Sequence, residues 1–137
     1  MSLKQLYDWL PINSPTFGKV YSPIIPLEVQ ASNGDWKVFY PEVDSGAIIS
    51  VFNKYDCEFL GYELGVGKQF SLKGVLGDAA SSYIHNLNLK IGNNIIQARI
   101  AFTDGKNHKQ LLGRVDIFDK FHICLNGRNL KTEIIKE

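Results

Sequence analysis

The chain has 137 residues, which is enough for one domain built around a single hydrophobic core. Its 15 basic and 14 acidic residues give a formal net charge of +1 and form no basic block, so the composition argues against partners such as nucleic acid or an anionic membrane. No apolar run approaches the roughly 18 residues of a membrane span, and the first residues lack the pattern of a secretion signal.

Cysteine and histidine usage bears on compartment and cofactors. Cys57 and Cys124 are too few and too far apart for a disulfide framework or a metal clip, which predicts two reduced thiols in a cytoplasmic protein. His85, His108 and His122 show no metal-ligand spacing. We therefore expect neither a metal nor another cofactor.

The N-terminal residues hold the first predicted element. Ser2 to Leu10 reads as a short helix that Pro11 ends. Residues 1–20 are expected to be an extension of unknown role, and residues 21–137 to form the main domain.

Turn signals then recur about every ten residues, which favours an all-β fold. The segments 23–30 and 36–40 flank Asn33-Gly34, a pair suited to a tight hairpin. Further strands are expected at 48–52, within 70–84, at 83–91 and at 95–102.

The C-terminal part contains the second predicted helix and a last hairpin. Ile117, Phe118 and Phe121 fall on one helical face, so Arg114 to Phe121 reads as a short helix. Strands at 122–125 and 130–135 are expected to turn at Asn126-Gly127.

Two short motifs carry the functional information. Val43-Asp44-Ser45-Gly46-Ala47 places a carboxylate, a hydroxyl and a glycine directly after a strand-like run. Leu111-Leu112-Gly113-Arg114 follows later, an apolar pair that runs into a glycine and is expected to pack beneath the acidic turn. Asp-Ser-Gly alone is a common turn sequence, so it is the pairing of the two motifs that is informative.

Together these motifs resemble the retropepsin family of single-domain aspartic proteases. The run from Leu111 to Phe121 is most similar to the cellular members from bacteria and archaea, and the resemblance covers about residues 22 to 135. It implies a closed acid-protease barrel with one short C-terminal helix. It also implies an aspartic endopeptidase that hydrolyses peptides or unfolded protein.

The resemblance assigns roles to individual residues. Catalysis would fall to Asp44, Ser45 and Gly46, with Asp44 from each of two subunits sharing a proton and holding the attacking water. Because the chain has one Asp-Ser-Gly, a working site implies a homodimer. Substrate would contact Ala47 and a flap tip, and the second motif would support the turn; these residues are Gly77, Asp78, Ala79, Leu111, Leu112, Gly113 and Arg114.

Three positions depart from the family pattern. Glu42 stands where an apolar strand residue is common, so we expect that strand end to be half exposed. Ile48 stands where retroviral enzymes often carry an acid that pairs with the equivalent of Arg114, which leaves Asp116, Asp119 or a carboxylate across the dimer as its expected partners. The role of the C-terminal strand in an intersubunit sheet stays open.

Two other functions remain possible at this point. One is a catalytically silent retropepsin-fold module that dimerises or binds peptides. The other is a small β-barrel for an apolar ligand, in which Asp-Ser-Gly is coincidental and the chain is a monomer.

Overall fold

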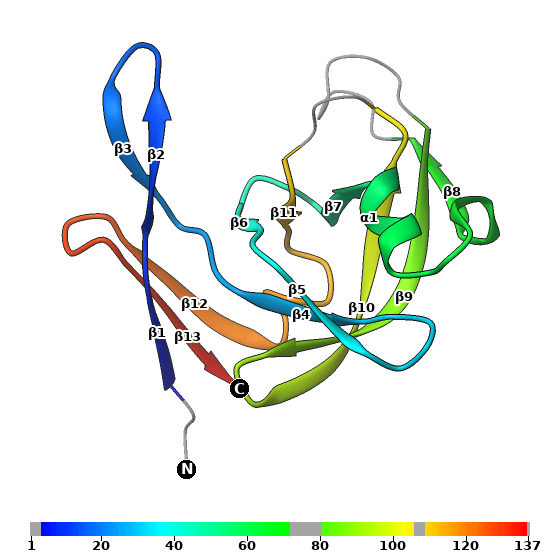
Figure 1. Cartoon of the computed structure of the whole chain (residues 1–137). Helices are drawn as coiled ribbons and strands as arrows, with labels where there is room; N and C mark the ends of the chain where they lie inside the picture. Colours follow the sequence, from blue (N-terminus) through cyan, green and yellow to red (C-terminus); the bar gives the residue numbers. More distant parts are fainter. Residues whose placement is uncertain (1–3, 72–80, 106–108, 137) are drawn as a thin grey trace.

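A computed structural model describes residues 4–71, 81–105 and 109–136 of the chain (Figure 1). Strands dominate it, and the elements in chain order are β1 (Lys4–Asp8), β2 (Leu10–Ser14), β3 (Gly18–Ser22), β4 (Leu27–Gln30), β5 (Trp36–Phe39), β6 (Glu42–Val43), β7 (Ser50–Asn53), α1 (Lys54–Phe59), η1 (Leu64–Val66), β8 (Lys68–Ser71), β9 (Ser81–Ile91), β10 (Asn94–Thr103), β11 (Leu111–Leu112), β12 (Phe121–Asn126) and β13 (Lys131–Lys136). No described helix is long and apolar enough to cross a membrane.

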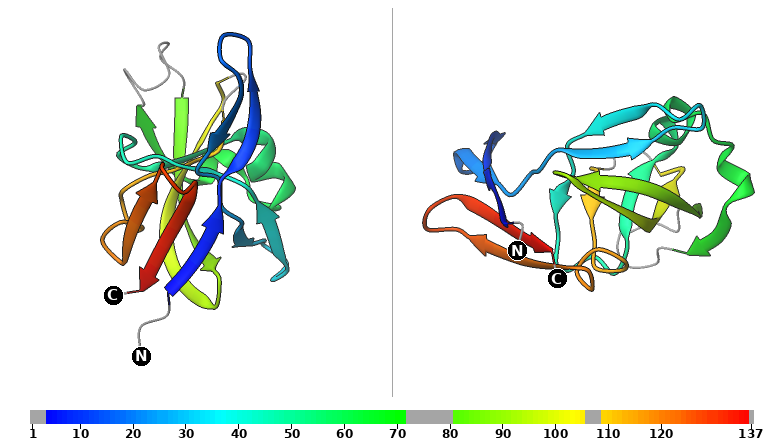
Figure 2. Two further views of the ribbon diagram at one scale, coloured as in Figure 1. Left: turned by 90° about the vertical axis from the view of Figure 1, so that its left-hand side faces the viewer. Right: turned by 90° about the horizontal axis from the view of Figure 1, so that it is seen from below.

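The main sheet has the strand order β5-β4-β9-β10-β7-β11-β6, and β8 adds to β9. It curls around the core as a half-barrel, seen from below in Figure 2. The expected closed barrel is not confirmed, because the end strands β5 and β6 do not pair with each other in the described part. Two pairings are parallel, β10 with β7 and β11 with β6, and the second brings distant segments together at the candidate site.

The core follows from alternation along the long β9–β10 hairpin. Leu87, Leu89 and Ile91 are buried at every second position of β9, as expected for a strand with one face inward. Phe52 on β7 packs edge-to-face against Phe102 on β10, with ring centroids 6.2 Å apart. Each such fully buried apolar side chain contributes about 2–3 kcal/mol of transfer free energy.

Both expected hairpins are confirmed. β4 pairs with β5 in antiparallel register, and Gly34 in their turn has a φ of 93°, which favours glycine. β12 pairs with β13 across the predicted turn. β8 and β9 also pair antiparallel, from Lys68 opposite Ile84 to Ser71 opposite Ser81. The predicted flap tip at Gly77, Asp78 and Ala79 lies outside the described residues.

The helix predicted from Ser2 to Leu10 is wrong. Lys4–Asp8 is strand β1, and it forms a three-stranded terminal sheet in the order β1-β13-β12. Alternate residues of β1 face inward, so Tyr7 is half-buried while Leu6 is exposed. Pairing with β13 supplies hydrogen bonds that outweigh the weak local preference for helix.

The helix predicted from Arg114 to Phe121 is also wrong. The segment is a series of turns, because Asp116 has a φ of 66° and interrupts the helical ladder. Two hydrogen bonds of helical spacing survive, from Phe118 N–H to the Arg114 carbonyl at 2.9 Å and from Phe121 N–H to the Ile117 carbonyl at 3.1 Å.

The α-helix that the structure does contain, α1, was not predicted. Asn53 caps it: its Oδ1 accepts the Asp56 N–H at 3.0 Å, and Asp56 Oδ2 accepts the Asn53 N–H at 3.1 Å. This reciprocal capping box is the sequence signal that was overlooked.

Candidate active site

The first motif forms a tight turn, here called the acid turn (Asp44, Ser45, Gly46 and Ala47). Strand β6 leads directly into it through the buried Val43. Within the turn, the Gly46 N–H donates to Asp44 Oδ1 at 2.8 Å, and the Ala47 N–H donates to the Asp44 carbonyl at 3.2 Å. These bonds fix the direction of the carboxylate, and Asp44 remains half-buried rather than enclosed.

The second motif lies against the acid turn. β11 pairs in parallel with β6, so Leu112 lies opposite Val43. The Asp44 N–H donates to the Leu112 carbonyl at 3.0 Å, and the Arg114 N–H donates to the Ala47 carbonyl at 2.9 Å. Backbone hydrogen bonds therefore flank Asp44 on both sides of the turn.

The contact continues beyond the turn, where the Val115 N–H donates to the Ile48 carbonyl at 2.9 Å. We call residues 42–50 together with residues 111–115 the acid-turn junction. Because its hydrogen bonds join segments distant in sequence, the acid turn cannot move without disturbing β11.

Gly113 is required by this packing. A Cβ at this position would lie 2.4 Å from the Ile49 carbonyl carbon and 2.9 Å from the Ala47 carbonyl oxygen. The Gly113 N–H donates to Ser50 Oγ at 2.9 Å inside the protein. Ser50 is fully buried, and sequence reasoning missed it because an isolated serine in an apolar strand gives no functional signal.

Arg114 does not pair with Asp116. Its Nη1 donates instead to the carbonyl of Ser45 in the acid turn, at 2.7 Å. Asp116 binds Arg99 on β10, accepting the Arg99 N–H at 2.9 Å, its Nε at 2.8 Å and its Nη2 at 3.1 Å. The hydrogen bond from the Arg99 side chain lowers the pKa of the Asp116 carboxyl, against a smaller opposing effect of burial.

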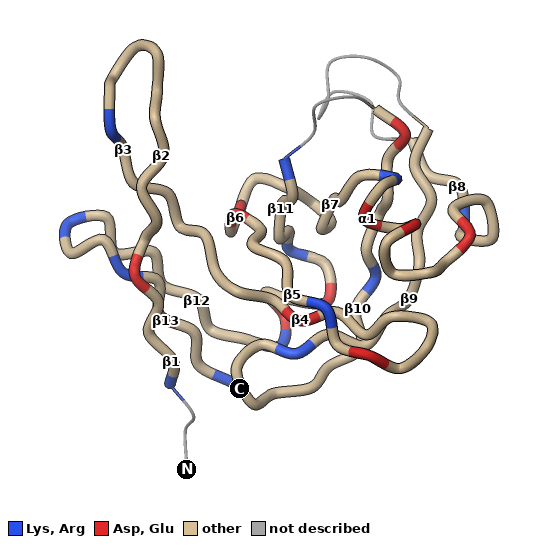
Figure 3. Tube along the Cα trace, in the orientation of Figure 1, with Lys and Arg blue, Asp and Glu red and all other residues tan. Residues whose placement is uncertain are grey.

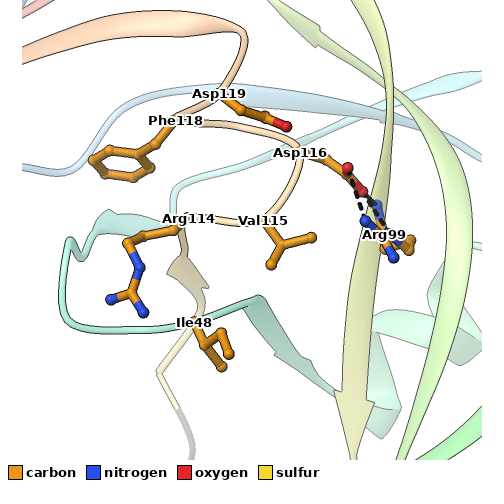
Figure 4. Close-up of a pocket in the computed structure, with 7 residues that line it drawn as sticks. All are labelled: Ile48, Arg99, Arg114, Val115, Asp116, Phe118 and Asp119. Atoms are coloured by element: carbon orange, nitrogen blue, oxygen red, sulfur yellow. Dashed lines mark hydrogen bonds and ion pairs between the residues drawn. The ribbon is translucent and has the colours of Figure 1, made fainter.

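A shallow cavity of about 470 Å³ lies beside the acid turn (Figure 4). Its apolar lining comes from Ile48, Val115 and Phe118, and its polar lining from both arginines and two aspartates; the full set is Ile48, Arg99, Arg114, Val115, Asp116, Phe118 and Asp119. The cavity is wide open to solvent and borders the turn through Ile48.

The predicted site residues thus fall into three groups. The first group is the acid turn, and the second is the motif that lies against it: Leu111, Leu112, Gly113 and Arg114. Ser45 and Gly46 are exposed, but Ala47 is buried. Glu42 is half-buried, as expected, and Lys109 pairs with it at 3.6 Å. The third group, residues 77–79, is outside the described part.

The electrostatic environment is mixed. Basic and acidic residues are both scattered over the described chain (Figure 3). No group of three or more His, Cys, Asp or Glu side chains within residues 4–71, 81–105 and 109–136 is arranged to hold a metal ion. The acid turn therefore offers a fixed carboxylate, exposed hydroxyl and backbone groups, and an open approach.

The sequence matches no protein-family model and no curated protein. Solved structures do share its fold. A retropepsin-like aspartic protease from Rickettsia conorii is 17% identical, covers 99% of this chain and 93% of its own, and superimposes with a TM-score of 0.64.

Two further structures agree. The retroviral protease-like domain of Ddi1 from Leishmania major is 16% identical over 85% of this chain and 95% of its own, with a TM-score of 0.56. EIAV protease, solved with the inhibitor HBY-793, is 18% identical over 75% and 88%, with a TM-score of 0.50. The chain therefore has a retropepsin-like fold.

Proposed function

We propose that this protein is an aspartic endopeptidase whose site is assembled from two copies of the chain. One observation carries the proposal: in a retropepsin-like fold, the Leu-Gly-Arg segment holds an Asp-Ser-Gly-Ala turn by backbone hydrogen bonds on both sides of Asp44. A fixed carboxylate in an open position is what a preorganised acid–base site requires.

The chemistry needs two carboxylates that share one proton. Like charges about 3 Å apart cannot both ionise, so one Asp44 carboxyl stays protonated while the other accepts a proton from water. The activated water attacks the peptide carbonyl while the protonated carboxyl polarises its oxygen, and the C–N bond then breaks as a carboxyl proton passes to the leaving amine nitrogen. Since each chain supplies one Asp-Ser-Gly, the second carboxylate comes from a second copy related by a two-fold axis.

The other residues take supporting roles in this proposal. The exposed Ser45 hydroxyl bonds to backbone across the dimer, and Gly46 allows close approach of the substrate. Ala47 is buried, so in this proposal it keeps the neighbouring substrate pocket roomy by its small size. Residues 77–79, which lie outside the described part of the chain, are assigned in this proposal to a flap that covers the substrate.

We assign the activity to residues 21–137, with residues 1–20 as an extension to that unit. The substrate is a peptide or an unfolded protein, because a two-fold site at an open turn accepts an extended chain. We place the enzyme in the cytoplasm, since Cys57 and Cys124 are both free thiols.

The decisive experiment is cleavage of a denatured protein between pH 3 and pH 7, wild type against Asp44→Asn. We expect the substitution to abolish cleavage, because the site then lacks both ionisable carboxyls, while dimerisation persists. Asp35→Asn in the β4–β5 turn is the matched control and should cleave normally. Retained cleavage by Asp44→Asn, or strict monomers at assay concentration, would refute the proposal.

The experiment also separates the alternatives. A stable dimer that cleaves nothing, and binds peptides equally well as Asp44→Asn, would indicate a silent dimerisation or peptide-binding module. A monomer that binds apolar ligands independently of Asp44 would indicate a small-ligand barrel.

A further inference from the structure

The hairpin formed by β2 and β3, which we call the arm (residues 10–22), stands away from the rest of the molecule (Figure 1). Among the strands of the described residues, these two pair only with each other. None of the buried hydrophobic residues of the core belongs to the arm. An isolated two-stranded ribbon is marginally stable at best in water, so its own hydrogen bonds do not explain its shape.

The arm is nevertheless apolar. Leu10 and Ile12 are both exposed, and Val20 lies opposite Ile12 on the same face. Tyr21 is exposed on the other face, and Phe17 near the turn is 80% exposed. Lys19 is its single charged residue. Exposed apolar residues gathered in this way mark a surface that another molecule covers.

Both ends of the arm are fixed. At the first, the Trp9 N–H donates to the Leu130 carbonyl at 2.9 Å, and Trp9 Nε1 donates to Oγ1 of the buried Thr132 at 2.9 Å. At the second, the Val43 N–H donates to the Pro23 carbonyl at 2.8 Å. Val43 immediately precedes Asp44, so the arm starts from the terminal sheet and ends beside the acid turn.

The position of the arm indicates which molecule covers its exposed apolar residues. The arm and the terminal sheet make up one side of the molecule, which faces the viewer on the left of Figure 2. Under the proposed function, on which this inference rests, a second copy must approach the acid turn. An arm whose second end adjoins that turn is therefore continuous with the surface that the second copy covers.

We infer that the arm docks on a second copy of this chain and holds the two acid turns together. By two-fold symmetry each arm contact occurs twice, so a modest apolar patch counts double in the free energy of dimerisation. The arm buries Ile12 and Phe17 against the partner, which accounts for apolar side chains that the single chain leaves in water.

The first test measures the dimer dissociation constant by sedimentation equilibrium for wild type and for Ile12→Ser combined with Phe17→Ser. We expect the constant to rise at least about tenfold. The matched control replaces two exposed apolar residues outside the arm, Val66→Ser with Ile95→Ser, and should leave the constant unchanged. An unchanged constant in the arm variant would overturn the inference.

The second test identifies the contact directly. A photoreactive benzoylphenylalanine at position 17 is introduced, and ¹⁴N- and ¹⁵N-labelled chains are mixed in denaturant and refolded together. We expect cross-links that join the arm of one isotope to the body of the other. Cross-links within one isotope only, or only to an added peptide substrate, would overturn the inference.

These outcomes distinguish the arm from the protease. If the protein is a dimer that cleaves substrate and the arm variant dimerises as tightly as the wild type, the inference about the arm is overturned and the proposed function stands. If dimerisation depends on the arm but no cleavage depends on Asp44, the inference about the arm stands and the proposed protease function is overturned. A wild type that stays monomeric at assay concentrations overturns both the arm inference and the proposed function, because the proposed site needs two copies of the chain.

Discussion

The acid-turn junction and the arm are stabilised in opposite ways. In the junction, segments far apart in sequence are joined by backbone hydrogen bonds, and Leu112 and Ser50 beneath the turn are fully buried. In the described part of the chain, the backbone hydrogen bonds of the arm join its own two strands, apart from one local bond from the Ile24 N–H to the Ser22 carbonyl, and Ile12 and Phe17 are exposed. The junction and the arm are both built from β-strands, but the junction packs against the rest of the chain and the arm does not.

The contrast shows where specificity resides in this fold. The junction needs particular residues because any added atom meets backbone that cannot move aside. The arm needs only apolar character, because its contacts lie outside the single chain. Substitutions in the junction should therefore change the stability of the chain itself, while those in the arm should change association.

The largest effect is expected for Gly113→Ala. The new Cβ would lie 2.4 Å from the Ile49 carbonyl carbon, so the backbone must separate and the acid turn loses its support. We expect the free energy of unfolding, measured by urea denaturation, to fall by at least about 3 kcal/mol. Gly65→Ala is the control, since no atom lies within 4 Å of its Cβ, and a change beyond about 0.5 kcal/mol there would weaken the steric argument.

A hydroxyl comparison sharpens the same point. Ser50 and Ser82 are both fully buried, but Ser50 Oγ accepts the Gly113 N–H, whereas Ser82 Oγ has no hydrogen-bond partner among the described residues. Ser50→Ala should cost about 1–2 kcal/mol because it leaves a buried N–H unsatisfied. Ser82→Ala should be neutral or stabilising. If both variants lose the same free energy of unfolding, the effect comes from removing a buried hydroxyl and not from losing the hydrogen bond to Gly113.

Asp116→Asn tests the ion pair next to the junction. The Arg99 hydrogen bond lowers the folded-state pKa of Asp116, so its stabilisation is present above the unfolded pKa of about 4 and is lost as pH falls through the folded value. We expect the substitution to cost about 1 kcal/mol at pH 7, since the pair is partly exposed, and progressively less below about pH 4.

Thermal unfolding of the two proteins between pH 3 and pH 7 measures this difference. Asparagine also tolerates the positive φ at position 116, so the backbone penalty stays small and the change in charge dominates. A destabilisation that does not depend on pH would assign the effect to backbone conformation instead.

The sequence predicted those parts of the fold that depend on short-range rules. Asn33-Gly34 and Asn126-Gly127 predicted their hairpins because those turns need glycine or asparagine, and partial alternation predicted β9. Prediction from the sequence failed where residues distant in the chain determine the conformation. Lys4–Asp8 is a strand because it pairs with the edge of β13, and Asp116 interrupts the expected helix where it binds Arg99.

The candidate site divides in the same way. The contact between the two motifs was expected from the resemblance, and the structure shows it as backbone pairing of β6 with β11. The partner of Arg114 was not predictable, because a carbonyl of the acid turn carries no sequence signal. Ser50 was missed for the same reason, and the catalytic role of Asp44 stays a prediction until cleavage is measured.

The smallest effect on stability is expected in the arm. Ile12→Ser removes an exposed side chain that makes no core contact, so at concentrations where the chain is monomeric its free energy of unfolding should change by less than about 0.5 kcal/mol. At concentrations where the wild type is dimeric, the same substitution should lower the thermal midpoint, because association stabilises the folded state by mass action. Melting curves across a hundredfold range of concentration measure both regimes. A loss of equal size at every concentration would mean that the arm packs within its own chain, and the contrast with the acid-turn junction would then disappear.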